Sequence, residues 1–218
     1  MEKLDAQILK ENKKLILLVD LDQTLIDSTV QERAKHERSV YQIQFKRGTD
    51  CSTYYTKIRP GTRRFLQSLS SKFELIACTK AKDVYAKAVV NILDPKAELF
   101  KNRIISADHF SSPHSKEDIL EKICLDGDTS LIIAIDDRRD MWSSYDQMIQ
   151  VKPFNYWKAP WRYEFSSRVL SFLRLEKKKI EVFHDDKDYL FALLSLLDNV
   201  YSQYFNSKKQ SSTKVKTD

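Results

Sequence analysis

Residues 15–24, LILLVDLDQT, are the stretch from which the fold can be argued. A run of apolar residues ends at Asp20 and is followed by Asp22 and Thr24. A short continuous apolar run is typical of a strand that is buried on both faces of a parallel sheet. Ligands of open α/β sheets bind beyond the carboxyl ends of the strands, and side chains two apart leave a strand on the same side. The stretch therefore predicts a site that Asp20 and Asp22 address together.

Two carboxylates placed together repel each other unless their charge is offset. A bound divalent cation, a shared proton or both would offset it. The alternative interpretation is a solvated polar turn. The position of the pair directly after LILLV favours a chemical site over that turn.

The composition limits the class of protein. The chain has 218 residues, 42% of them hydrophobic, which is enough for one domain or for one domain with an insertion. The low glycine content and the 31% of charged residues favour an α/β or helical protein over a many-turned β-sandwich. Half of the net charge of +6 comes from the tail that begins at Ser207. The remaining charge is too weak to indicate nucleic-acid binding by itself.

The cysteines and the two ends of the chain carry further expectations. Cys51, Cys78 and Cys124 form no C-x-x-C pair and suggest reduced thiols in an intracellular protein. Residues 1–13 read as an N-terminal extension without the apolar core of a signal peptide, and no apolar stretch approaches the length of a membrane span. We expect residues 207–218 to be a disordered basic tail.

A β-hairpin is expected directly after the Asp-rich stretch. Apolar and polar residues alternate over 41–46 and again over 54–58, with a turn signal around Gly48. The hairpin would form an insertion at about 31–58, where it could cover or line the site. It is too small to be a full cap domain, so the site should be open enough for a peptide.

Strands and helices alternate after the hairpin. FELIAC (73–78), RIIS (103–106), LIIAI (131–135) and IQVKPF (149–154) read as further strands, and helices are expected over 62–69, 84–93 and 117–123 and from Asp185 or Asp186 onward. This order predicts a parallel sheet with right-handed crossovers. Polar residues follow the strand ends, so they should converge on one edge of the sheet; they are Asp20, Thr79, Lys116 and Asp136.

This set of side chains suits phosphoryl transfer. Asp20 is the candidate nucleophile, and Asp22 would protonate the leaving oxygen and later deprotonate a water molecule. Mg²⁺ and Lys116 would offset the charge of the phosphate oxygens. The backbone carbonyl of Asp22 would be close enough to the metal to be a ligand.

The chain resembles a known family over about residues 14–154. DLDQTLIDST, KIRPGTRRFL, FELIACTKAKDVYA, LDPKAELFKNRIIS, AIDDRRDMW and IQVKPF are similar, in this order, to the catalytic domain of the TFIIF-associating RNA polymerase II C-terminal-domain phosphatases. That family belongs to the haloacid dehalogenase superfamily. The resemblance implies an α/β, haloacid-dehalogenase-like Rossmannoid parallel sheet with a small β-hairpin insertion after the first strand. The catalytic domain would span 14–206.

The resemblance also implies roles for individual residues. Asp20 would be the phospho-acceptor and a metal ligand, and Asp22 the acid/base and a metal ligand through its carbonyl. Thr24 would support the motif and help to bind substrate. Thr79 and Lys116 would contact the phosphate.

Further roles fall on the second acidic pair and on the rim. Asp137 matches a side-chain metal ligand, and Asp136 matches the carboxylate that orients the lysine. Arg59 and Arg138 match substrate-binding basic residues at the rim. One position departs from the family: relatives usually carry arginine where this chain has Ala107. Relatives also usually carry a BRCT domain after the catalytic region, and too few residues follow that region here to form one.

The resemblance implies a nuclear, Mg²⁺-dependent protein serine/threonine phosphatase. Its substrate would be the phosphorylated C-terminal repeat domain of RNA polymerase II, with general transcription factors as further candidate partners. Three alternatives remain: a phosphatase of the same superfamily with another phosphoprotein or a small metabolite as substrate, a non-catalytic phosphopeptide-binding module, and a nucleic-acid binder. The last rests on basic and aromatic residues that mix over 157–180, a pattern that a solvated helix face explains better.

Overall fold

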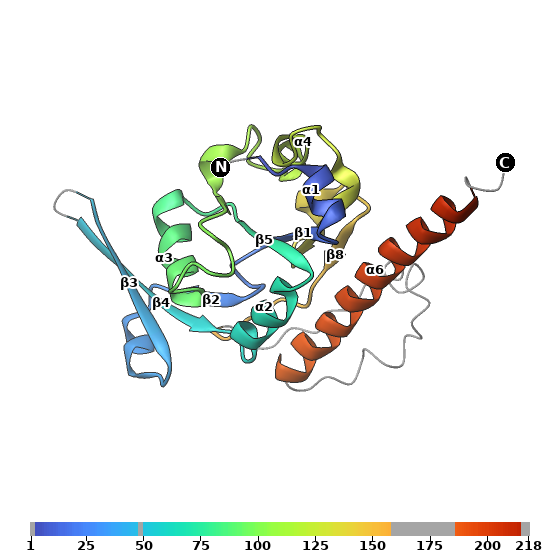
Figure 1. The fold of residues 1–218 in the computed structure, drawn as a ribbon. Coiled ribbons are helices and arrows are strands. Elements are labelled where there is room, and N and C mark those ends of the chain that lie inside the picture. Colours follow the sequence, from blue (N-terminus) through green and yellow to red (C-terminus); the bar gives the residue numbers. More distant parts are fainter. Residues whose placement is uncertain (1–2, 48–49, 158–185, 215–218) are drawn as a thin grey trace.

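The computed structural model describes residues 3–47, 50–157 and 186–214. Its core is a parallel five-stranded sheet in the order β6-β5-β1-β7-β8, which confirms the predicted α/β fold. Helices lie against this sheet, and a separate antiparallel sheet projects from it (Figure 1). The strands of the parallel sheet are β1 (Leu15–Val19), β5 (Phe73–Cys78), β6 (Ile104–Ile105), β7 (Ile132–Asp136) and β8 (Met148–Gln150).

Strand β1 is central because its sequence can be buried on all sides. All five residues of LILLV are buried, and the strand pairs with β5 on one side and with β7 on the other. The residues of β7 are buried as well. The last predicted strand is shorter than expected, because β8 ends at Gln150 and does not continue to Phe154.

The helices occupy the predicted positions. Gly61 precedes α2 in the left-handed region, with a φ of 87°, which is a conformation that glycine adopts without strain. Asp94 ends α3 and accepts hydrogen bonds from three following backbone N–H groups. The helices are α1 (Ala6–Glu11), α2 (Thr62–Ser70), α3 (Asp83–Leu93), α4 (Leu120–Ile123) and α6 (Asp186–Lys214), with short 3-10 turns η1 (Glu32–His36), η2 (Ala107–His109), η3 (Glu117–Ile119), η4 (Thr129–Leu131) and η5 (Arg139–Trp142).

Both ends of the described chain differ from the simplest expectation. Helix α1 packs Ala6 and Leu9 into the core, so the segment before residue 14 contributes to it. Helix α6 lies beside α2 and buries Tyr189, Leu190 and Leu193 (Figure 1). It continues to Lys214, so the expectation of disorder from Ser207 is wrong for 207–214. Once a helix is nucleated, each added residue gains a backbone hydrogen bond, which allows it to run past its apolar face.

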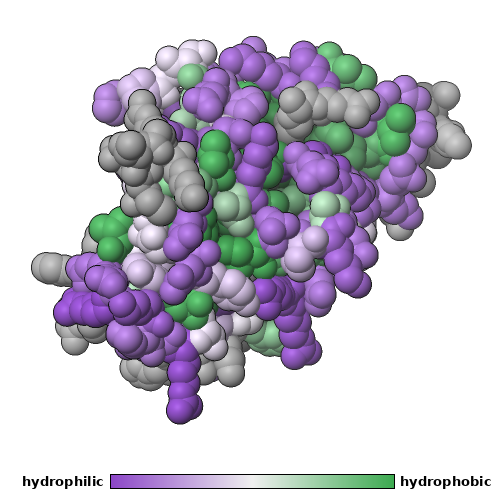
Figure 2. Space-filling view, turned by 90° about the vertical axis from the view of Figure 1, so that its left-hand side faces the viewer, coloured by the Kyte–Doolittle hydropathy of each residue, from purple (hydrophilic) through white to green (hydrophobic). Residues whose placement is uncertain are grey.

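The predicted hairpin is present, but it belongs to a three-stranded sheet. Strands β3 (Val40–Arg47) and β4 (Asp50–Ile58) pair with each other, and β4 also pairs with β2 (Ile26–Thr29). The insertion therefore begins nearer the Asp-rich stretch than residue 31. From the side on which the hairpin projects, the surface is mostly hydrophilic, with hydrophobic residues grouped toward its centre (Figure 2).

Three other expectations bear on the class of protein. No described helix has the length and apolar character that a membrane span needs. Cys78 and Cys124 are buried free thiols, in line with the expected reduced state. Beyond Trp157, the basic and aromatic stretch of 157–180 lies outside the described residues.

Candidate active site

The polar residues that follow the parallel strands meet at one edge of the sheet. Asp20 comes directly after β1, and its N–H donates to the carbonyl of Ile135 in β7 at 3.0 Å. Thr79 comes directly after β5 and donates in the same way to Ile105 at 2.9 Å. The sheet ladder thus fixes the backbones of Asp20 and Thr79 at its carboxyl edge, where ligands of such sheets bind.

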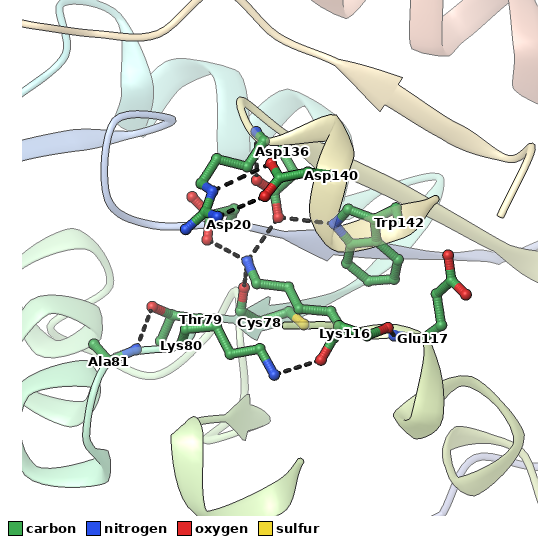
Figure 3. Close-up of polar contacts among 12 residues, drawn as sticks. Asp20, Cys78, Thr79, Lys80, Ala81, Lys116, Glu117, Asp136, Asp140 and Trp142 are labelled. Atoms are coloured by element: carbon green, nitrogen blue, oxygen red, sulfur yellow. Dashed lines mark hydrogen bonds and ion pairs between the residues drawn. The ribbon is translucent and has the colours of Figure 1, made fainter. Parts of the chain in front are cut away.

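Lys116 is the centre of the site. It is 2% exposed, and its Nζ donates to Asp20 Oδ1 and Asp136 Oδ2 at 2.6 Å each and to the Cys78 carbonyl at 3.0 Å (Figure 3). Burial acts to lower the pKa of Lys116, but the carboxylates of Asp20 and Asp136 outweigh it and raise that pKa. Lys116 is therefore a permanent buried cation between two carboxylates.

Asp136 is held by donors from the protein itself. Besides Lys116, its Oδ2 accepts from the indole Nε1 of Trp142 at 2.8 Å, and its Oδ1 accepts from the backbone N–H of Arg138 at 2.9 Å. Both carboxylate oxygens are thus occupied. This geometry suits the orienting role expected of Asp136 better than a role as metal ligand.

The acidic side chains form a cluster that fits a divalent cation. One oxygen each from Asp20, Asp136 and Asp137 lies within 4.8 Å of the other two, and all three residues are buried. Burial and then the charge of Asp136 raise the pKa of Asp137 to about 7, and the same two causes raise the pKa of Asp20. Because Asp136 is engaged elsewhere, Asp20 and Asp137 are the carboxylates available to a hard cation such as Mg²⁺.

Asp22 is positioned by a residue that the sequence placed only on an apolar helix face. Tyr85 of α3 donates its hydroxyl to Asp22 Oδ1 at 2.7 Å, and the Tyr85 hydroxyl oxygen is also 2.7 Å from Ser28 Oγ. Burial raises the pKa of Asp22, which favours the protonated form that a general acid needs. The Tyr85 ring packs edge-on against Tyr54 of the hairpin, with centroids 5.3 Å apart. The hairpin and the candidate acid are therefore connected through Tyr85.

The two candidate hydroxyl groups lie in different surroundings. Thr79 Oγ1 accepts from the backbone N–H of Ala81 at 3.0 Å, which leaves its own hydrogen for an anion. Thr24 is buried, and its Oγ1 has no hydrogen-bond partner among the described residues. Thr79 is thus the better placed of the two to donate to a phosphate.

The two rim arginines have different outcomes. Arg138 is exposed and pairs with Asp140 at 2.6 Å, which is compatible with a rim position. Arg59 is 1% exposed, so the expectation that it lies at the rim is wrong. Its Nη1 donates to the carbonyls of Thr24 and Lys152.

Aromatic rings from distant parts of the chain explain the burial of Arg59. Its guanidinium lies 4.4 Å from the ring centroid of Tyr189 in α6 and 5.7 Å from that of Phe154. Such stacking suits the planar guanidinium group. The sequence around Arg59 does not indicate these rings, because they come from segments far along the chain.

The position without the usual arginine lies beside the loop that follows β5. Ala107 donates its backbone N–H to the carbonyl of Ala81 at 2.8 Å. The same loop carries Lys80, whose Nζ donates to the Ser112 carbonyl at 2.6 Å. A cation is therefore present near Ala107, although its contacts are within the protein.

The fold and the site together define a haloacid-dehalogenase-like phosphatase: a doubly wound parallel sheet whose central strand ends in Asp-x-Asp-x-Thr, beside a buried lysine and a second acidic pair. The family model described as "NLI interacting factor-like phosphatase" matches residues 15–183. The chain belongs to this family.

Curated relatives carry one recurring name. The RNA polymerase II C-terminal domain phosphatase of Caenorhabditis elegans is 36% identical over 159 residues, which cover 71% of this chain and 23% of that protein. The Homo sapiens protein of the same name is 36% identical over 156 residues, which cover 71% of this chain and 16% of the relative. The chain therefore matches less than a quarter of the length of either relative.

Solved structures agree with the fold. An arginine-to-alanine variant of the fission yeast RNA polymerase II CTD phosphatase Fcp1, bound to beryllium fluoride, has a TM-score of 0.75 and 27% sequence identity. The match covers 96% of this chain and 68% of that one. A second structure, of Fcp1 described as an essential RNA polymerase II CTD phosphatase, has a TM-score of 0.74.

Proposed function

We propose that this chain is a Mg²⁺-dependent protein serine/threonine phosphatase that acts on the phosphorylated C-terminal repeat domain of RNA polymerase II in the nucleus. The observation that carries the chemistry is the buried contact of Lys116 with Asp20 and Asp136. The substrate is inferred from the names of the relatives. Residues 14–206 form the proposed catalytic domain, and general transcription factors are further candidate partners.

In the first step, an oxygen of Asp20 attacks the phosphorus of a phosphoserine or phosphothreonine. The bond from phosphorus to the serine or threonine oxygen breaks, and that oxygen takes the proton of Asp22. Lys116 and the hydroxyl of Thr79 offset the charge on the phosphoryl oxygens. Asp136 and its partner Trp142 keep Lys116 oriented.

In the second step, the aspartyl-phosphate on Asp20 is hydrolysed. Asp22, now a carboxylate, takes a proton from water, and the water oxygen attacks phosphorus. The bond to Asp20 breaks, inorganic phosphate leaves, and both aspartates return to their starting states. The hydrogen bond from Tyr85 orients Asp22 for both proton transfers.

The donor set fits a resident cation. Asp20, Asp137 and the backbone carbonyl of Asp22 would hold Mg²⁺, which when bound neutralises charge on the phosphoryl group. The raised pKa of Asp137 and of Asp20 supports this assignment, because carboxylates that repel each other in a buried cluster are stabilised by a cation. The small hairpin insertion favours a peptide over a small metabolite as substrate.

The test compares substrates and variants. Wild-type protein should hydrolyse singly phosphorylated repeat peptides faster than small phosphate esters, and only with Mg²⁺. Asp20→Asn should lose turnover, whereas Asp188→Asn, a change of the same kind at an exposed position of α6, should not. Beryllium fluoride should inhibit the wild type by bonding to Asp20.

The outcomes separate the alternatives. Ordinary turnover in Asp20→Asn would rule out the aspartyl-phosphate mechanism. Binding of phosphopeptides without turnover in the wild type would indicate a binding module instead. Preference for small esters or for unrelated phosphoproteins would keep the phosphatase and remove the polymerase substrate.

A further inference from the structure

The peptide unit that precedes Lys116 is held at both of its polar ends. The N–H of Lys116 donates to the carbonyl of Met141 at 2.9 Å. The C=O of the same unit belongs to Ser115, and it accepts a hydrogen bond from the ammonium group of Lys80. The direction in which the Lys116 side chain leaves the backbone depends on this peptide plane.

Lys80 links the sheet edge to the loop that carries Lys116. It follows Thr79, and its Nζ also donates to the Ser112 carbonyl at 2.6 Å and lies 3.7 Å from the ring centroid of Phe110. Figure 3 shows the Lys80 side chain reaching from the end of β5 to the chain beside Lys116. The contacts of Lys80 thus span residues 110–115.

The loop has little regular structure of its own to do this work. Between β6 and η3, all of it within the described residues, it contains only the three-residue turn η2. A sheet ladder fixes Asp20 and Thr79, but no ladder reaches residues 110–116 in the described chain. The charge-assisted hydrogen bonds of Lys80 are strong enough to replace that missing support.

We propose that Lys80 is a positioning residue, which holds the loop of residues 110–115 so that Lys116 stays between Asp20 and Asp136. This inference rests on the proposed phosphatase function. A direct contact of Lys80 with substrate, as a replacement for the arginine missing at Ala107, is the rival explanation. The structure favours positioning, because the Lys80 ammonium already serves two carbonyls and an aromatic ring. Its partial burial, which lowers the pKa of Lys80, also indicates a group turned toward the protein.

The experiment uses two lysines of the same loop. Lys80→Met removes the ammonium at nearly constant length, and Lys82→Met removes the same charge from an exposed lysine two residues away. We expect Lys80→Met to lower kcat for a repeat phosphopeptide by about tenfold and to change KM by less than about twofold, since misplacement of a catalytic group affects the transition state. Lys82→Met should keep the wild-type kcat.

Lys80→Arg keeps the test decisive if Lys80→Met does not fold. Arginine retains the charge but cannot place a single nitrogen between two carbonyls, so positioning predicts a lower kcat at constant KM. A substrate contact predicts the opposite, because arginine binds phosphate at least as well as lysine does. An unchanged kcat in the Lys80 variants, or a rise in KM alone, overturns the proposal.

The control with wild-type protein separates this inference from the proposed function. If the wild type shows no phosphopeptide hydrolysis with Mg²⁺, the proposed function fails and positioning of a catalytic Lys116 fails with it. If the wild type is active and Lys80→Met equals it, only the role of Lys80 is wrong. Melting curves of all variants verify that kcat is compared between folded proteins.

Discussion

Arg59 and Lys116 are both buried cations, but the regions around them use the charge differently. Arg59 is surrounded by backbone carbonyls and the rings of Tyr189 and Phe154. Lys116 lies between the carboxylates of Asp20 and Asp136. Carbonyls and rings are fixed partners that join segments of the fold. Carboxylates beside a cluster with raised pKa values are partners that a cation or a phosphoryl group can rearrange.

The comparison shows which property distinguishes a catalytic cation from a structural one. Burial does not, because Arg59 is 1% exposed and Lys116 is 2% exposed. The partners do, because a buried charge must be compensated and the compensating groups decide what else can bind. The predictions below test this distinction.

The largest effect is expected for Lys116→Met. Loss of the ammonium should lower kcat by about 10²–10³-fold, because charge on the phosphoryl oxygens is no longer offset. The fold should persist, since Asp20 and Asp136 can take up protons when the cation is gone. Steady-state kinetics and thermal melting measure both effects.

Lys122→Met is the matched control for that variant. Lys122 is an exposed lysine of α4 and should keep the wild-type kcat. Turnover of Lys116→Met close to that of the wild type would remove Lys116 from the catalytic site.

Arg59→Met should affect stability instead of chemistry. Two carbonyls would lose their donor and two rings their cation, so we expect a loss of about 3 kcal/mol in the free energy of unfolding. Urea denaturation measures this loss, and the KM of the folded protein should not change. Arg64→Met, at an exposed position of α2, should leave stability nearly constant. An unchanged midpoint together with a raised KM would restore Arg59 to the substrate-binding rim.

The fold could largely be predicted because its signals are local. LILLV and FELIAC are continuous apolar runs, and both are strands of the parallel sheet. Strand β2 was missed because IDST has neither such a run nor a clear alternation, and it becomes a strand by pairing with β4. The helix beyond residue 206 was missed because composition indicates solvation and does not reveal continuation of an existing helix.

The candidate site was predictable where a residue follows a strand. The positions of Asp20, Thr79 and Asp136 required only the strand ends and a parallel sheet. Tyr85 and Trp142 were missed as polar partners, since their hydrogen bonds depend on side-chain direction and, for Tyr85, on a residue 63 positions away. The burial of Arg59 depends on rings whose approach no local pattern encodes.

The affinity for Mg²⁺ should depend on pH through Asp137. Its pKa is raised to about 7, so the folded protein without cation holds a proton there below that pH. Mg²⁺ must displace this proton, so the apparent Kd should fall by up to about tenfold per pH unit on going from about pH 5.5 to about pH 7 and then level off. Calorimetric titration at several pH values measures it.

Asp137→Asn sharpens this prediction. The variant has no proton to release at position 137, so its Mg²⁺ affinity should be weak and its dependence on pH reduced. The raised pKa of Asp20 leaves the remaining slope. A Kd of the wild type that stays constant over this pH range would contradict the assignment of Asp137 as a metal ligand.

The smallest effect is expected for Ala107→Arg, which adds a third kind of cation to the comparison. The backbone of Ala107 is bonded to the loop after β5, so an arginine there would start close to Thr79 and Lys80. A guanidinium at this position has no carboxylate partner assigned by the fold and can offer a charge-assisted contact to the substrate. We expect KM for a repeat phosphopeptide to fall by about threefold while kcat stays constant. Ala107→Gln, of similar length but uncharged, should not reproduce the fall, and added salt should reduce it. A change in kcat at constant KM would instead mean that position 107 acts on the Lys116 loop, and that a cation at the rim can be catalytic through the same support that we assign to Lys80.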